Sequence, residues 1–330
     1  MRVLVTGGAG FIGSHLSEKL LRLGNEVSVL DDLSTGSLAN IRQLIENSEF
    51  ADRFFLTTDS ILNRETLSRL IGSCDAVMHL AAVVGVLNIL KDPLGVIETN
   101  IRGTENVLEL SAKFGRKILI TSSSEVYGKH SHAPLVETDD CIYGPSSKFR
   151  WSYAATKLID EFAALSYYRT VELQVVVARL FNTIGPRQTG RYGMVVPRFI
   201  KQAIIGEPIT IYGDGKQTRT FTHVRNVVDA LIELLESAEG IGQVVNIGGE
   251  EEISILQLAE KIKFMLGSQS ELQFVPYEEA FAEDFEDMMR RVPSVEKLRS
   301  IIGTWEPAGL DEMLRDAIDY YTAEFSSEKS

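Results

Sequence analysis

A glycine-rich turn near the N-terminus constrains the fold of this chain more than any other feature. Residues 2–6 form a short apolar run rich in valine, and Gly7, Gly10 and Gly13 follow with GxxGxxG spacing. Such a turn lets the backbone approach a pyrophosphate and lets the next helix pack tightly on the strand. The anion then lies at the N-terminus of the helix predicted over 11–23, where free amides and the helix dipole favour negative charge. The turn therefore predicts a dinucleotide site.

Acidic residues follow the second and third predicted strands. Asp31 ends a strand predicted over 26–30, at the position, about 20 residues beyond the turn, that bonds the adenosine ribose hydroxyls. A carboxylate there repels the extra phosphate of NADP, so we predict NAD as the cofactor. Asp32 either shares this role or is a solvated loop acid. Asp59 follows a candidate strand at 54–57 and is a candidate adenine contact, although its spacing more often belongs to a helix N-cap.

Strand and helix patterns alternate through the first half of the chain. Apolar runs predict strands at 77–80, 117–121 and 174–180, and helical patterns cover 94–114 and 152–169. This alternation is typical of an α/β fold with a doubly wound parallel (Rossmann) sheet.

The pattern changes after about residue 180, where glycine and proline become frequent and short strands mix with helices. We therefore predict an NAD-binding Rossmann domain over 1–180 and a smaller, mixed α/β substrate domain over 181–330. A strand near 244–248 is expected to return to the main sheet.

Composition excludes several classes of function. The 330 residues carry 33 basic and 46 acidic side chains, a net charge of −13, which argues against nucleic-acid or membrane-surface partners. Cys74 and Cys141 stand far apart, in neither a disulfide nor a zinc pattern, so we expect no metal and a cytoplasmic location. No apolar run reaches the roughly 18 residues that a transmembrane helix needs, and the N-terminus lacks the anatomy of a signal peptide.

A YxxxK pair suggests acid–base chemistry. Tyr153 and Lys157 lie four residues apart in the helix predicted over 152–169, so both side chains face the same side. A neighbouring cation lowers the pKa of a tyrosine, which makes Tyr153 a candidate base for a hydroxyl near neutral pH. The pair alone is a weak signal. It gains weight from the serines at 122–124, which follow strand 117–121 at the sheet edge where ligands bind.

Six features in this order resemble the extended short-chain dehydrogenase/reductase family of nucleotide-sugar epimerases, dehydratases and decarboxylases. They are TGGAGFIG at 6–13, Asp31, HLAA at 79–82, SSSEVYG at 122–128, YAATK at 153–157 and RLFNTIGPRQ at 179–188. The resemblance extends at least to the WEP at 305–307. It implies that bound NAD takes a hydride from the sugar, usually at C4, and returns it within one turnover.

The resemblance assigns roles to the serine and tyrosine segments. It implies Tyr153 as the base, Lys157 as its partner and a ligand of the nicotinamide ribose, and Ser123 as the hydroxyl that bonds the reacting oxygen. His79 is interpreted as structural. The cofactor contacts predicted in this way are Gly7, Gly10, Phe11, Ile12, Gly13, Asp31, Asp32, Asp59, Leu80, Ala81, Ala82, Ser122, Tyr153 and Lys157.

The resemblance also implies residues for the nucleotide sugar. Asn182 is expected to bond the sugar or a phosphate, and Arg219 the diphosphate, which an arginine fork suits. Val196 and Tyr212 lie in segments similar to those that line the base, taken as uracil by analogy alone; Tyr212 also fits a core strand aromatic. The full substrate set is Ser124, Asn182, Val196, Tyr212, Arg219 and Arg291.

Three segments favour the UDP-glucuronate decarboxylase (UDP-xylose synthase) branch of the family. Glu125 stands where galactose-type 4-epimerases generally lack an acid, and Ser124 stands where 4,6-dehydratases carry the proton-donating Asp. The run KFRWSY at 148–153 resembles the decarboxylase pattern R-W-x-Y. The run at 287–294 resembles a segment whose arginine, here Arg291, faces the sugar carboxylate.

Decarboxylation needs control of the carboxylate and a proton for the enolate. Arg291 is expected to position the uronate, and Glu125 to relay the proton through a hydroxyl or water. Alternatively, Glu125 holds a nearby loop and Arg291 caps a helix or lies at the rim. The product is either a 4-keto pentose or the pentose reduced by hydride return.

Other outcomes on the same fold are a 4-epimerase acting on UDP-glucose or UDP-glucuronate and, next, an NDP-glucose 4,6-dehydratase. An inactive NAD sensor is disfavoured because Tyr153 and Lys157 are both present. The resemblance further implies a homodimer through the helices at 94–114 and 152–169. The apolar residues of the second helix exceed one buried stripe; they are Leu158, Ile159, Phe162 and Leu165.

Overall fold

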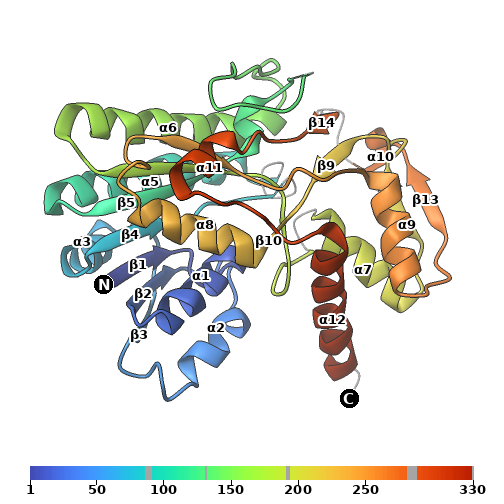
Figure 1. Ribbon diagram of the computed structural model, residues 1–330, viewed down its shortest axis with the longest axis horizontal. Coiled ribbons are helices and arrows are strands. Elements are labelled where there is room, and N and C mark those ends of the chain that lie inside the picture. Colours follow the sequence, from blue (N-terminus) through green and yellow to red (C-terminus); the bar gives the residue numbers. More distant parts are fainter. Residues whose placement is uncertain (86–90, 131, 191–193, 281–287, 329–330) are drawn as a thin grey trace.

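A seven-stranded sheet forms the centre of the molecule, as the computed structural model shows for residues 1–85, 91–130, 132–190, 194–280 and 288–328 (Figure 1). All its neighbouring strands are parallel, in the order β11-β6-β5-β4-β1-β2-β3. The strands are β1 (Arg2–Thr6), β2 (Glu26–Asp31), β3 (Phe54–Thr58), β4 (Ala76–His79), β5 (Lys117–Ser123), β6 (Val175–Leu180) and β11 (Val244–Ile247). The predicted doubly wound sheet is confirmed.

The strand order reverses between β1 and β4. The chain first builds outward from β1 through β2 to β3, and then returns to build β4, β5 and β6 on the other side of β1. Ligands of such sheets bind at this switch point, beyond the carboxyl ends of the strands. β11 pairs with β6, so the chain re-enters the sheet after a long excursion.

Helices cover both faces of the sheet. On one face lie α1 (Phe11–Arg22), α2 (Leu38–Ile45), α8 (Val224–Glu236) and α11 (Glu296–Ile302), and on the other lie α3 (Arg64–Ser73), α5 (Pro93–Phe114) and α6 (Arg150–Val171). Strand residues alternate between the two cores. Val3 and Val5 belong to the first core and Leu4 to the second, as expected for strands buried on both sides.

The remaining elements gather beside the carboxyl edge of the sheet, at the right of Figure 1. Here α7 and α9 pack together, and α12 packs on α7, around a separate apolar core. The elements are β7 (Thr183–Ile184), α7 (Val195–Ile205), β8 (Ile209–Tyr212), β9 (Thr218–Thr220), β10 (Thr222–His223), β12 (Glu252–Ser254), α9 (Ile255–Met265), β13 (Leu272–Val275), α10 (Tyr277–Ala280), β14 (Arg290–Arg291) and α12 (Leu310–Glu328). We call this group the smaller part of the molecule.

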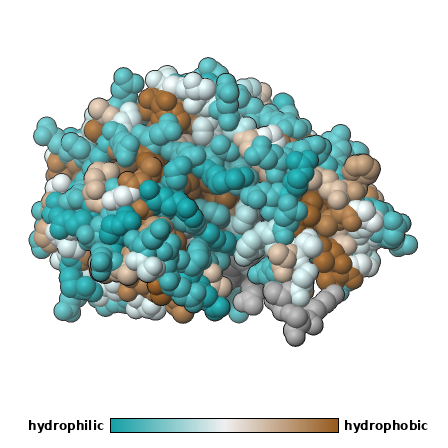
Figure 2. Space-filling view, turned by 60° about the horizontal axis from the view of Figure 1, so that its bottom comes forward, coloured by the Kyte–Doolittle hydropathy of each residue, from teal (hydrophilic) through white to brown (hydrophobic). Residues whose placement is uncertain are grey.

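The surface is mostly polar, and apolar side chains gather over the smaller part (Figure 2). Phe264 on α9 and Phe274 on β13 are exposed there. Within the described ranges, no helix is long and apolar enough to cross a membrane. The same ranges contain no group of three or more His, Cys, Asp or Glu side chains placed to hold a metal ion.

Candidate active site

The glycine turn connects β1 to α1 in a shape that only glycine allows. Gly7 has a φ of 73°, and a Cβ there would lie 2.8 Å from the amide nitrogen of Ala81. A Cβ on Gly13 would overlap the carbonyl oxygen of Gly7. Gly10 is the N-cap of α1 and offers no side-chain acceptor, so the first-turn amides face the cavity without a capping side chain. This arrangement fits the pyrophosphate of a dinucleotide.

Asp31 supports the glycine turn from the end of β2. Its Oδ2 accepts a hydrogen bond from the Ala9 amide and its Oδ1 accepts one from the Leu33 amide, each at 2.9 Å. Burial raises the pKa of Asp31, and these amides oppose the rise. Asp32 is exposed and accepts from the Ser34 amide. Both carboxylates line the cavity described below.

Asp59 organises the loop after β3. Its carboxylate accepts hydrogen bonds from Thr66 Oγ1 at 2.6 Å and from Asn63 Nδ2 at 2.8 Å. The N-cap of α3 is Asn63, whose side chain accepts from the amides of Glu65 and Thr66. The N-cap interpretation of Asp59 was therefore wrong by four residues, while Asp59 itself lines the cavity.

One cavity of about 510 Å³ extends from the glycine turn to the smaller part of the molecule. Every residue predicted to contact cofactor or substrate lines it, because the carboxyl ends of the central strands meet at this edge. At or after the carboxyl ends of the central strands these include Phe11, Ile12, Leu80, Ala81, Ala82, Ser122, Ser123, Ser124 and Asn182, and in the smaller part Val196, Tyr212, Arg219 and Arg291. Asp287, the first residue of the downstream arginine segment, lies outside the described residues.

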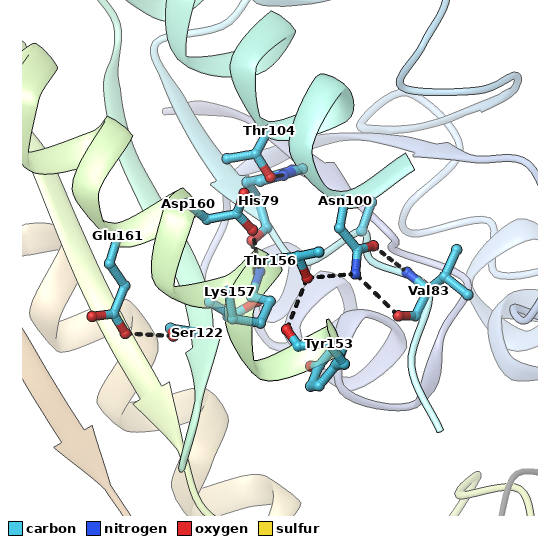
Figure 3. Close-up of polar contacts among 12 residues, drawn as sticks. His79, Val83, Asn100, Thr104, Ser122, Tyr153, Thr156, Lys157, Asp160 and Glu161 are labelled. Atoms are coloured by element: carbon cyan, nitrogen blue, oxygen red, sulfur yellow. Dashed lines mark hydrogen bonds and ion pairs between the residues drawn. The ribbon is translucent and has the colours of Figure 1, made fainter. Parts of the chain in front are cut away.

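Tyr153 and Lys157 lie in the first two turns of α6, facing the cavity (Figure 3). Burial raises the pKa of Tyr153, the charge of Glu125 raises it further, and a hydrogen bond with Ser123 only partly offsets them. The expected lowering of this pKa by Lys157 is not found. The Lys157 ammonium instead donates to Asp160 Oδ2 at 2.9 Å.

The backbone of the first α6 turn is tied to α5. Thr156 Oγ1 donates to the Tyr153 carbonyl at 2.8 Å, and Asn100 Nδ2 on α5 donates to Thr156 Oγ1 at 3.3 Å. Asn100 Oδ1 in turn accepts from the amide of Val83, a cavity residue after β4, at 2.8 Å (Figure 3). These buried hydrogen bonds fix the position of Tyr153 relative to the carboxyl end of β4.

The side chain of Ser122 points differently from that of Ser123. Its hydroxyl donates to Glu161 at 2.5 Å.

Two arginines hold the carboxylate of Glu125. Glu125 lies in the 3-10 turn η1 (Ser124–Tyr127) and forms ion pairs with Arg150 Nη1 and, at 2.9 Å, with Arg291 Nη2. Burial alone would raise the pKa of Glu125, but the two guanidinium charges outweigh it and hold this pKa far below its usual range. The acid is therefore an anion at neutral pH. This state argues against the proton relay predicted for Glu125.

The far end of the cavity carries the predicted nucleotide residues. Asn182 Nδ2 donates to the Thr220 carbonyl at 3.1 Å, and Arg219 Nη1 donates to the Thr218 carbonyl at 2.8 Å. The Arg198 guanidinium lies 3.9 Å from the centre of the Tyr212 ring. Tyr212 therefore stacks on Arg198 in the cavity wall and is not part of the apolar core.

Sequence reasoning gave no role to several residues of the site. Arg150 belonged to the quoted KFRWSY motif without an assigned task, and Arg198 lies two residues after Val196. The signal that could have found these two residues was a positive charge within or beside a segment already expected to line the site. Asn100 and Asp160 gave no signal, because polar residues on a helix usually indicate its solvated face.

The switch-point cavity, the glycine turn and the Tyr153–Lys157 pair together define a dinucleotide-dependent enzyme built on a Rossmann sheet. The chain belongs to the NAD dependent epimerase/dehydratase family, whose model matches residues 3–248. It is thus an NAD-dependent enzyme of the extended short-chain dehydrogenase/reductase type, as the sequence predicted.

Relatives cover nearly the whole chain. A UDP-N-acetyl-alpha-D-glucosaminuronate decarboxylase of Bacillus cytotoxicus is 38% identical over 97% of this chain and 97% of its own length. A UDP-glucuronic acid decarboxylase 1 of Danio rerio is 36% identical over 98% of this chain and 73% of its own length. The crystal structure of a UDP-glucuronic acid 4-epimerase from Bacillus cereus, with UDP-glucuronic acid and NAD, is 32% identical and superposes with a TM-score of 0.87, over 98% of this chain and 99% of that one.

Proposed function

We propose that this protein decarboxylates a UDP-linked uronic acid, UDP-glucuronate in the first instance, through transient oxidation at C4. The Bacillus cytotoxicus relative, whose name specifies an N-acetylated uronic acid, makes the 2-acetamido sugar the second candidate substrate. Oxidation at C4 places a ketone β to the carboxylate. Such a β-keto acid loses carbon dioxide readily, because the remaining electron pair delocalises as an enolate.

The observation that carries this proposal is the Arg150–Glu125–Arg291 cluster. Two buried cations share one buried anion beside Ser124. The buried Nε of Arg291 has no hydrogen-bond partner among the described residues, and a substrate carboxylate would supply an acceptor for this guanidinium. Because Arg291 already donates to Glu125, it would position the uronate without gripping it. A carboxylate held in this way is still able to leave as carbon dioxide.

We assign the oxidation chemistry to Tyr153 and Ser123. When bound, NAD would supply the hydride acceptor for C4 and the hydride for its later reduction. Tyr153 removes the proton of the C4 hydroxyl, Ser123 bonds the same oxygen, and Lys157 bonds the nicotinamide ribose. Asp31, Arg219 and Tyr212 serve the two nucleotide ends of the cavity.

Product mass tests the proposal directly. Purified protein is incubated with NAD and, in separate reactions, UDP-glucuronate, its 2-acetamido counterpart, UDP-glucose and UDP-galactose. Loss of the mass of carbon dioxide from a uronate supports decarboxylation. Unchanged mass with an inverted C4 makes the protein a 4-epimerase, and loss of water makes it a dehydratase. Tyr153→Phe is the negative control: it should lose several orders of magnitude in kcat and keep UDP-sugar affinity.

We further propose a homodimer formed by α5 and α6, and a division of labour between residues 1–180 for NAD and 181–330 for the nucleotide sugar. Ile159 and Phe162 on α6 and Leu94 on α5 are exposed apolar side chains on two helices that pack against each other. The free thiols of Cys74 and Cys141 support a reducing, cytoplasmic setting.

A further inference from the structure

Asp160 is a buried carboxylate without a role in the proposed chemistry. It lies one turn after Lys157 on α6, is 1% exposed, and accepts the Lys157 ammonium at 2.9 Å (Figure 3). The next residue, Glu161, is also a buried acid, but it turns to Arg179 at 2.7 Å. Each carboxylate thus has its own cation, which is what makes two adjacent buried acids tolerable.

A second set of contacts approaches Asp160 from α5 and the sheet. Thr104 on α5 lies beside Asp160 and lowers the pKa of this carboxyl. His79 Nε2 lies 3.1 Å from Thr104 Oγ1, and His79 Nδ1 lies 2.7 Å from Thr6 Oγ1. Burial and the nearby Lys157 lower the pKa of His79 to about 3, so its ring is neutral and carries one proton.

One bond of this chain has a fixed direction, because Thr6 Oγ1 accepts from the Ala81 amide at 3.3 Å. The neutral His79 ring has one N–H donor and one acceptor nitrogen, so it donates to one threonine hydroxyl and accepts from the other. Thr104, His79 and Thr6 thus form a buried, uncharged polar chain beside Asp160.

The Asp160 charge also acts on the tyrosine. Burial and the charge of Glu125 on η1 raise the pKa of Tyr153, and the charge of Asp160 raises it as well. Ser123 and Arg150 lower it, and Arg291 reaches this site through Glu125. Burial also raises the pKa of Asp160, opposed by Lys157 and Thr104.

We propose that Asp160 is a positioning residue of the reaction: its buried carboxylate fixes the Lys157 ammonium in the cavity wall and offsets its charge at Tyr153. The proposal rests on the role assigned to Tyr153 as the base. Tyr153, Lys157 and Asp160 then act as a triad, in which the Asp160 carboxylate sets the basicity of Tyr153 through the Lys157 ammonium.

The test is the pH profile of kcat with saturating substrate for Asp160→Asn. Removing the negative charge leaves the ammonium uncompensated, so the acid limb of the profile should move to lower pH by about one unit. Asp160→Glu restores the charge and should restore the limb. Asp160→Ser makes the same neutral replacement with a smaller side chain, should the Asn variant fail to fold. Thr104→Val is the control, because it disturbs the same buried chain without removing a charge and should leave the limb in place.

A direct titration separates this inference from the proposed function. The ultraviolet absorbance of tyrosinate is followed against pH in the NAD complex, and each variant is compared with its own Tyr153→Phe double mutant. A downward shift for Asp160→Asn supports the triad even if product analysis shows no loss of carbon dioxide. An unmoved or upward-shifted titration, or an equal shift in Thr104→Val, would overturn it.

Discussion

Arg291 Nη2 lies 2.9 Å from Glu125 Oε1, so the residue assigned to the substrate carboxylate already holds a carboxylate of the protein. Glu125 comes from the turn after β5 and Arg291 from β14, two segments far apart in the chain. The pairing joins the smaller part of the molecule to the edge of the main sheet. It also limits how tightly Arg291 can grip a second anion.

Replacing Glu125 should therefore strengthen substrate binding while slowing the reaction. Glu125→Gln leaves two buried guanidinium groups with no protein anion between them, and a uronate would fill that place. We expect a lower KM for UDP-glucuronate and a lower kcat, with NADH and a 4-keto uronate accumulating because a clamped carboxylate resists leaving. NADH absorbance in single-turnover mixing measures this. A control is Glu109→Gln, which breaks only an exposed ion pair with Arg64; an unchanged KM for the Glu125 variant contradicts the explanation.

Replacing Arg291 should weaken recognition of the uronate alone. Arg291→Ala leaves Glu125 paired with Arg150, so no buried charge is stranded and the fold should persist. The loss of one charged hydrogen bond predicts roughly 10- to 100-fold weaker binding of UDP-glucuronate, with UDP affinity nearly unchanged by calorimetry. The neighbouring Arg290 pairs with Glu252, and Arg290→Ala is the matched control. Equal weakening for UDP and UDP-glucuronate would remove Arg291 from the carboxylate site.

The sequence predicted which residues share the cavity, but not how their charges are arranged. Gly7 and Asp31 were predicted from the strand and turn pattern of a parallel sheet, Tyr153 from its helical spacing to Lys157, and Arg219 from the family resemblance. The sign of the Tyr153 pKa shift was wrong because only the Lys157 charge was considered. Charges that come from other turns of the chain depend on packing, which spacing along a helix does not report.

The buried face of α6 illustrates this limit. Arg150, Lys157, Asp160 and Glu161 are all nearly inaccessible, although four charged residues in a helix ordinarily indicate exposure. They are buried because each has an oppositely charged partner: Arg150 pairs with Glu125 on η1, Lys157 with Asp160, and Glu161 with Arg179 on β6. The sequence of a helix with charged residues on its buried face therefore looks like that of a surface helix, because partners such as Glu125 and Arg179 lie elsewhere in the chain.

The cofactor preference should depend on Asp31. The wild-type protein is expected to bind NAD more tightly than NADP, because a carboxylate at the end of β2 repels a 2′-phosphate. Asp31→Ala should relax this preference and also lower NAD affinity, since the Ala9 and Leu33 amides lose their acceptor. Fluorescence titration with both dinucleotides measures the ratio. Asp32→Ala, at an exposed position, should change the ratio less, and a larger effect there would transfer the role to Asp32.

The oligomeric state should depend on the outer face of α6. Phe162 is 64% exposed in the single chain and lies near Ile159, which is 46% exposed; burying such side chains contributes about 25 cal/mol per Å². Phe162→Glu would place a charge at the centre of this surface, so we expect a monomer by light scattering where the wild type is a dimer. Phe264→Glu is the matched control, because Phe264 is 86% exposed on α9 in the smaller part of the molecule. A wild-type monomer at micromolar concentration, or dissociation caused equally by both substitutions, contradicts an interface formed by α5 and α6.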